Sequence, residues 1–108
     1  MKAEIKLTKT MLDKAIIDAN NSVREFVKGF GVDFNKMKSG DRATLEAKFI
    51  DGTKTSINLY RTNNARGDRR ISIKGIKAKA EVGNTVIFKT KNYLSTYERE
   101  CLLHSQEL

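Results

Sequence analysis

The chain opens with alternating apolar and polar residues, and this pattern then gives way to a helical one. In residues 2–8 every second side chain from Ala3 to Leu7 is apolar, which predicts a strand with one buried face. The apolar residues that follow recur at helical spacing, and Thr10 is suited to cap this helix, with Asp13 at its third position. The expected apolar stripe of the helix is Met11, Leu12, Ala15, Ile16 and Ala19.

A second helix is predicted directly after two asparagines, which favour caps and turns over helix interiors. The stretch Ser22-Val23-Arg24-Glu25 has the form of a capping box, which marks a helix start. Gly29 and Gly31 are expected to end the helix. Its apolar positions at helical spacing are Val23, Phe26, Val27 and Phe30.

From residue 44 onward the apolar residues recur at every second position, as in strands. Asp51-Gly52 predicts a hairpin turn between the first two of these strands, and residues 62–68 form the loop before the third. The expected inward positions are Leu45, Ala47, Phe49, Ile57, Leu59, Ile71 and Ile73.

The last part of the chain contains a short helical segment and further strands. Residues 75–80 are compatible with one or two helical turns, and Gly83-Asn84 predicts a turn before the β-rich residues 85–88. Residues 93–98 suggest a final strand. The tail from residue 101 extends that strand, forms a short helix or frays.

These elements follow the order β-α-α-β-β-β-(α)-β-β, with short strands joined by tight turns. Such strands pair mostly in antiparallel fashion. We therefore expect one α+β domain over residues 1–108, built on a curled sheet or pseudobarrel of about six to seven short strands, with the N-terminal helix pair closing one side.

From the composition we expect a cytoplasmic protein. No apolar run approaches the ~20 residues of a transmembrane helix, so no membrane partner is expected, and the N-terminus lacks the apolar segment of a signal peptide. The single cysteine, Cys101, excludes an intramolecular disulfide. A cytoplasmic location makes Arg66-Gly67-Asp68, the tripeptide by which extracellular proteins engage integrins, a coincidence.

The formal net charge of +8 is concentrated in the middle of the chain. Residues 53–91 contain ten Lys or Arg and only two acidic residues, for a net +8, whereas residues 1–52 carry +2 and residues 92–108 carry −2. Localised positive charge is typical of polyanion binding.

Residues 61–70 carry the chemistry best suited to a nucleic acid. Four of the chain's seven arginines fall here, and the guanidinium fork can read guanine or clamp phosphate. We expect this segment to be a hairpin arm for the major groove, with Asp68 bracing one arginine and lysines holding the backbone. The candidate residues are Lys54, Arg61, Thr62, Asn63, Asn64, Arg66, Arg69, Arg70, Lys74, Lys77 and Lys79.

Three consecutive segments resemble the DNA-binding pseudobarrel. They are the strands and loop of residues 55–73, the helical turn at 75–80 and the run Val-Gly-Asn-Thr-Val-Ile-Phe at 82–88. This fold is shared by plant B-three-type transcription factors and the effector-binding N-terminal domain of EcoRII-type restriction endonucleases. Its members grip the major groove with two arms. The resemblance implies that residues 61–70 are the C-terminal arm, and that Thr8, Lys9 and Thr10 lie near the N-terminal arm.

Catalysis has little support in the sequence. Cys101 and His104 lie near an end expected to be mobile, without a positioned third group. Glu46 and Lys48 resemble half of a metal-dependent nuclease signature, with Asp41 or Asp33 as a second ligand. An acid followed two residues later by lysine is expected about 1.7 times by chance in this composition, and the chain has two such pairs.

We therefore expect a non-catalytic double-stranded DNA-binding domain without cofactor or metal, in a prokaryotic or phage restriction or regulatory context. It would act alone, as a homodimer or in a larger complex. Three alternatives stay open: an RNA-binding module, a small Mg-dependent nuclease using Glu46 and Lys48, and a protein that binds an acidic surface. With three Tyr and five Phe, few aromatic rings are free to stack on single-stranded bases.

Overall fold

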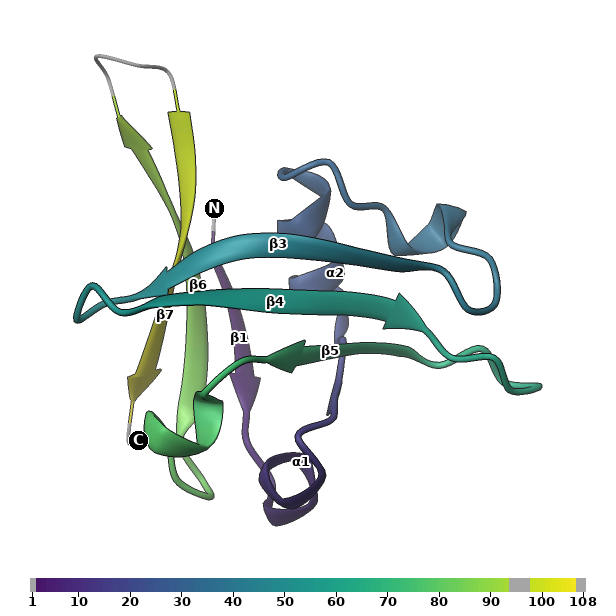
Figure 1. The fold of residues 1–108 in the computed structure, drawn as a ribbon, viewed down its shortest axis with the longest axis horizontal. Coiled ribbons are helices and arrows are strands. Elements are labelled where there is room, and N and C mark those ends of the chain that lie inside the picture. Colours follow the sequence, from purple (N-terminus) through teal and green to yellow (C-terminus); the bar gives the residue numbers. More distant parts are fainter. Residues whose placement is uncertain (1, 94–97, 107–108) are drawn as a thin grey trace.

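The computed structural model describes residues 2–93 and 98–106, whose strands all belong to one sheet (Figure 1). The elements are, in chain order, β1 (Lys2–Lys6), α1 (Lys9–Lys14), β2 (Ile17–Asp18), α2 (Asn21–Lys28), the 3-10 turn η1 (Phe34–Lys36), β3 (Arg42–Phe49), β4 (Lys54–Arg61), β5 (Arg69–Ile73), the 3-10 turn η2 (Ile76–Ala78), β6 (Thr85–Tyr93) and β7 (Glu98–Gln106).

The sheet has the order β1-β6-β7-β3-β4-β5-β2, and its strands pair antiparallel except for β3 with β7. In that parallel pair Ala47 lies opposite Cys101, and Phe49 lies opposite Leu103. The β3–β5 strands run across the direction of β1, β6 and β7, so the sheet curls back on itself (Figure 1). The expected α+β fold with a curled, mostly antiparallel sheet is confirmed.

The core lies inside this curl, where α2 packs against the sheet. Val23, Phe26 and Val27 form the buried face of α2, as the helical spacing predicts. The Phe26 ring lies 5.3 Å from that of Phe30 and 5.8 Å from that of Phe88 on β6, measured between centroids. The inward positions Ala47, Phe49, Ile57, Leu59, Ile71 and Ile73 are all buried, and Leu45 is partly buried against the core.

The first helix is shorter than its apolar stripe predicts. Its N-cap is Thr8, whose hydroxyl accepts a hydrogen bond from the Met11 backbone N–H at 3.2 Å, so the expectation of a Thr10 cap was wrong. The helix ends at Lys14 because Ala15 adopts a left-handed conformation, with φ at 54°. Ile17 then enters β2 and pairs with β5, an extended state that suits a β-branched residue.

The second helix begins with a different cap from the expected one. The Asn20 side chain accepts from the backbone N–H of Val23 at 3.0 Å, and so takes the N-cap position. The capping box was therefore wrong: Ser22 bonds to the Glu4 carbonyl of β1, and Glu25 pairs with Lys28. Asn is as good an N-cap as Ser, and the neighbouring strand gives Ser22 another partner.

The C-terminal tail belongs to the sheet, in agreement with the strand alternative for residues 101–106. Cys101 is fully buried, paired across to Ala47 and Thr90, so the expectation that Cys101 and His104 lie on a mobile end was wrong. Residues 94–97 of the expected 93–98 strand lie outside the described residues. In the described part of the chain, no helix is long and apolar enough to cross a membrane.

The β3–β4 hairpin is tied to η2 by a charged contact. The Nζ of Lys79 lies 2.6 Å from Asp51 Oδ2 and 3.2 Å from the Thr53 hydroxyl. The Lys79 hydrogen bond, followed by those from the Thr53 hydroxyl and backbone N–H, lowers the pKa of the Asp51 carboxyl below its usual range. Lys79 thus connects two segments that are distant in sequence.

Replacing Ala15 by glycine is expected to stabilise the protein. A non-glycine residue in the left-handed region is strained, and glycine relieves that strain at the exposed end of α1. We expect the free energy of unfolding in urea to rise by about 1 kcal/mol. A loss of stability would show that Ala15 is not held in this conformation.

Asp51→Asn should lower the melting temperature at neutral pH and have a smaller effect in acid. The variant keeps an acceptor for the Thr53 N–H but loses the charge facing Lys79. A depressed folded-state pKa gives stability that is present above the unfolded pKa and is lost as pH falls through the folded one. The difference in melting temperature between wild type and variant should therefore shrink below about pH 4. A difference that stays constant from pH 7 to 2 would contradict this.

Candidate nucleic-acid interface

The loop between β4 and β5, residues 62–68, is held closed by its own hydrogen bonds. Here we call it the arm loop; it lies at one end of the molecule's longest axis (Figure 1). The Thr62 N–H donates to the Asp68 carbonyl at 2.9 Å, and the Gly67 N–H donates to the Asn64 side chain at 2.9 Å. The Thr62 hydroxyl also donates to Asn64 Oδ1 at 2.9 Å. The loop conformation is therefore fixed by polar contacts rather than by apolar packing.

Arg61, at the end of β4, contacts both the arm loop and the segment after η1. Its Nη1 donates to the Met37 carbonyl at 2.8 Å, which fastens the end of β4 to the segment after η1. Its guanidinium also lies against Gly67, where an added Cβ would be 2.5 Å from Nε. Glycine is required here both by that approach and by its φ of +60°. We conclude that Arg61 positions the arm loop and is poorly placed to reach a ligand.

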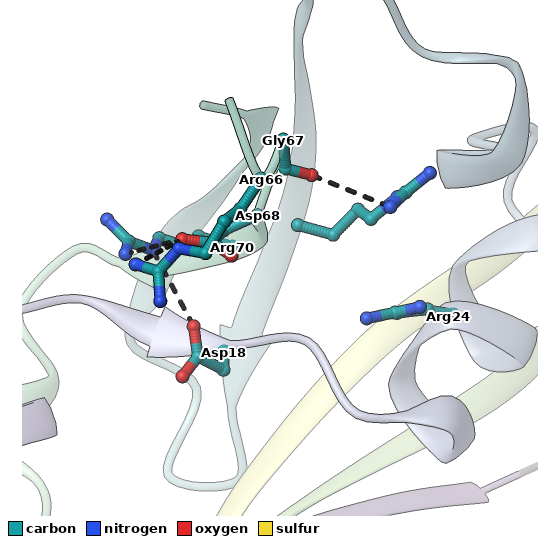
Figure 2. A pocket seen from close by; sticks show the side chains of 7 residues that line it. Asp18, Arg24, Arg66, Gly67, Asp68 and Arg70 are labelled. Carbon is teal, nitrogen blue, oxygen red and sulfur yellow. Dashed lines mark hydrogen bonds and ion pairs between the residues drawn. The ribbon is translucent and has the colours of Figure 1, made fainter. Parts of the chain in front are cut away.

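Asp68 joins two arginines, as the sequence suggested for a brace. Its Oδ2 lies 3.2 Å from Arg66 Nη2 and 3.0 Å from Arg70 Nη2 (Figure 2). The Nε of Arg70 is 3.5 Å from Asp18 Oδ1 on β2, an ion-pair distance without a hydrogen bond. Arg66 keeps 76% of its side-chain area exposed, whereas Asp68 and Arg70 keep 25% each. Arg66 is therefore the arginine of this group that solvent, or a ligand, can reach.

A second pair of arginines faces the same region from α2 and β5. The Arg24 Nε donates to the Ala19 carbonyl at 2.7 Å, and the Ala19 N–H donates to the backbone carbonyl of Arg69 at 2.9 Å. Arg69 Nη1 lies 3.5 Å from the Gly67 carbonyl. A cavity of about 250 Å³ lies between these groups, lined by Asp18, Arg24, Arg66, Gly67, Asp68, Arg69 and Arg70.

Arg24 and Arg42 join the candidate site although the sequence did not single them out. Arg42 on β3 is paired with Tyr60 on β4, and its guanidinium carbon lies 5.2 Å from the centre of the Tyr60 ring. Six of the chain's seven arginines thus lie at the arm-loop end. Neither Arg24 nor Arg42 is near the arm in sequence, so proximity could not identify them. The one sequence feature that they share with the arm residues is that they are arginines and not lysines.

The predicted lysines do not surround the arm. Lys54 lies at the opposite end of β4 from Arg61, roughly 25 Å away by the rise of a strand. Lys74 follows the far end of β5, and Lys79 is paired with Asp51 at the β3–β4 hairpin. Lys77 Nζ lies 3.4 Å from the Asp13 carbonyl at the end of α1. Proximity in sequence was misleading because β4 and β5 carry the chain away from the arm.

The N-terminal candidate segment is connected to β5 through a shared cavity. Thr10 and Arg70 line a second cavity of about 300 Å³, together with Thr8, Met11, Lys14, Ile16 and Asp18. Lys9 lies beside Thr10 in the first turn of α1 and is exposed.

The two asparagines of the arm loop differ in their availability. Asn63 is exposed, whereas Asn64 uses its side-chain oxygen within the loop. Asn63 is therefore the asparagine better placed for a base edge.

The residues of the nuclease alternative are not brought together. Glu46 and Lys48 share one face of β3, as expected, but Asp41 precedes the strand and lies roughly 17 Å from Glu46 by the rise per residue. Asp41 and Asp33 both accept backbone hydrogen bonds near η1. In residues 2–93 and 98–106, no group of three or more metal-ligating side chains occurs.

No protein-family model, curated protein or solved structure matches the chain. The relation to the DNA-binding pseudobarrel accordingly stays a prediction.

Gly67→Ala should destabilise the protein mainly by displacing Arg61. A Cβ at this position overlaps the guanidinium that bonds to Met37, so the cost should fall when Arg61 is first replaced by alanine. A double-mutant cycle in urea is expected to give a coupling energy of about 1 kcal/mol or more.

Gly52→Ala serves as the matched control for this cycle. Gly52 also has a positive φ, of +92°, but an added Cβ there would meet nothing within 4 Å. Its cost should add to that of Arg61→Ala without coupling. Equal behaviour of the two glycines would remove Arg61 as the reason for Gly67.

Proposed function

We propose that the protein binds double-stranded DNA with the arm loop and the arginines around it. The observation that carries this proposal is the gathering of six of seven arginines, from one helix, three strands and the arm loop, at one end of the molecule. Arginine offers a planar fork of donors that suits phosphate oxygens and guanine edges. A surface that served only solubility would need no such clustering.

The arm loop is suited to the major groove because its shape is fixed before binding. Its backbone is closed by Thr62 and Gly67, and Arg61 fastens its base to the next segment. Such preorganisation reduces the entropy lost when a ligand orders the loop. A two-stranded ribbon is also narrow enough for the major groove, which is about 12 Å wide.

Within the loop, Arg66 and Asn63 are the residues assigned to base edges. Both are exposed, and Asp68 orients Arg66 through a charged contact to one nitrogen of its guanidinium. The remaining donors of Arg66 can pair with guanine, and the Asn63 amide can pair with adenine. Thr10 of α1, which lines a cavity with Arg70, and its neighbour Lys9 are assigned to backbone phosphates.

Arg66→Ala should weaken discrimination between duplex sequences by about 1–3 kcal/mol at one base position. Arg66→Lys should retain much of the salt-dependent affinity but lose the discrimination, because lysine keeps the charge without the fork. Selection from random duplexes at two salt concentrations, followed by binding titrations on the selected sequence, measures both quantities.

Lys54→Ala is the control, since it removes one positive charge at the opposite end of β4. It should leave affinity and sequence preference close to those of the wild type. Equal losses for Arg66→Ala and Lys54→Ala on every sequence would contradict readout by the arm. Tighter binding to an RNA duplex of the same sequence would favour the RNA-binding alternative, and weak DNA binding even at low salt would favour an acidic protein partner.

A further inference from the structure

We propose that the cavity beside the arm loop binds a phosphate monoester through Arg24 and Arg69, neither of which is assigned to base edges. The proposed function enters only in naming a DNA 5′-phosphate as one source of this group; a free nucleotide is the other. The shared chemistry is a terminal phosphate that carries close to two negative charges.

The charges around the cavity leave an excess of two positive ones. Arg66 and Arg70 are balanced by Asp68 and Asp18, with which they form ion pairs. Arg24 and Arg69 also line the cavity, and neither has a carboxylate partner among the described residues. The cavity therefore has a neutral side and a side with a formal charge of +2.

Both uncompensated guanidinium groups are held in place by backbone carbonyls. Arg24 donates to the Ala19 carbonyl at 2.7 Å, and Arg69 lies 3.5 Å from that of Gly67. The Ala19 peptide also links the two elements, because its N–H donates to the carbonyl of Arg69. Figure 2 shows the Arg24 side chain extending from α2 toward the side of the cavity where Asp18 and Arg70 lie. The two arginines are thus oriented before any ligand arrives.

The lining also indicates which part of a nucleotide fits. All of the lining side chains are charged, and Gly67 adds only backbone. The lining has no aromatic side chain on which a base could stack, whereas its guanidinium groups suit phosphate oxygens. The Nε of Arg69 is buried without a hydrogen-bond partner in the described part of the chain, which leaves a donor unmatched beside the cavity.

The excess of two positive charges favours a monoester over a diester. A phosphate monoester carries about −1.5 to −2 at pH 7, with its second pKa near 6, whereas a phosphodiester within a DNA strand carries a single charge. A monoester dianion would balance Arg24 and Arg69 together. The same chemistry predicts that affinity falls as the ligand takes up a proton below about pH 6.

The test compares two duplexes of one sequence that differ only in having a 5′-phosphate or a 5′-hydroxyl. The phosphorylated duplex should bind the full chain about tenfold more tightly at pH 7.5, and this ratio should fall toward one at pH 5. Arg24→Gln should bring the ratio close to one at both pH values, and Arg24→Lys should keep part of it. Thermal melting of each variant verifies that it is folded.

Inorganic phosphate and a nucleoside 5′-monophosphate, used as competitors, identify the source of the group. If both displace the phosphorylated duplex to the level of the hydroxyl duplex, the site accepts a DNA end. If they bind in an Arg24-dependent manner while the two duplexes bind equally, the ligand is a free phosphate ester. Sulfate, which stays a dianion from pH 5 to 7.5, should itself bind in an Arg24-dependent manner with equal affinity at both pH values.

The proposal is overturned if no phosphate monoester shows binding that depends on Arg24. This outcome would leave the DNA proposal intact if Arg66→Ala still weakens discrimination between duplex sequences. Conversely, Arg24-dependent binding of inorganic phosphate without any duplex binding would support the phosphate site and reject the DNA-binding arm.

Discussion

The fold depends on the pairing of β7 with β3. On one side of this contact β1, β6 and β7 form an antiparallel group, and on the other side β3, β4, β5 and β2 form another. Among the residues that the structure describes, only the parallel register of Ala47 to Phe49 against Cys101 to Leu103 joins the two groups into one sheet. Because the groups cross at a steep angle, the junction also creates the space that α2 fills with Phe26 (Figure 1). The long-range pairing of the last strand thus fixes the curvature of the whole sheet.

The arm-loop end shows how a protein can hold many like charges close together. Two aspartates, Asp18 and Asp68, neutralise Arg66 and Arg70, while Arg61 and Arg24 are fastened by backbone carbonyls. The arrangement separates two roles that the sequence could not distinguish. Some arginines position the loop, and others stay exposed or line a cavity where an anion can balance them. Repulsion among them is limited by this internal pairing, and a polyanion would reduce it further.

Local patterns predicted much of the fold because strand alternation and turn residues act over a few positions. The period-two inward residues, the Asp51-Gly52 turn and the apolar face of α2 all follow from such patterns. The end of α1 did not, since Ile17 leaves the helical pattern to pair with Ile71, a partner 54 residues away in the sequence. Long-range contacts also decide which residues belong to the candidate site. The composition of residues 61–70 identified the arm, but Arg24 reaches it only through the fold, and Lys54 and Lys79 are carried to the other end.

The burial of Cys101 gives the β3–β7 junction a built-in chemical reporter. The chain has one thiol, and it lies on the joining strand with none of its surface accessible to solvent. A thiol-specific reagent can reach that sulfur only after the structure around it opens. The rate at which the folded protein is labelled therefore measures how often the structure around the β3–β7 junction opens, on a scale from local opening to complete unfolding.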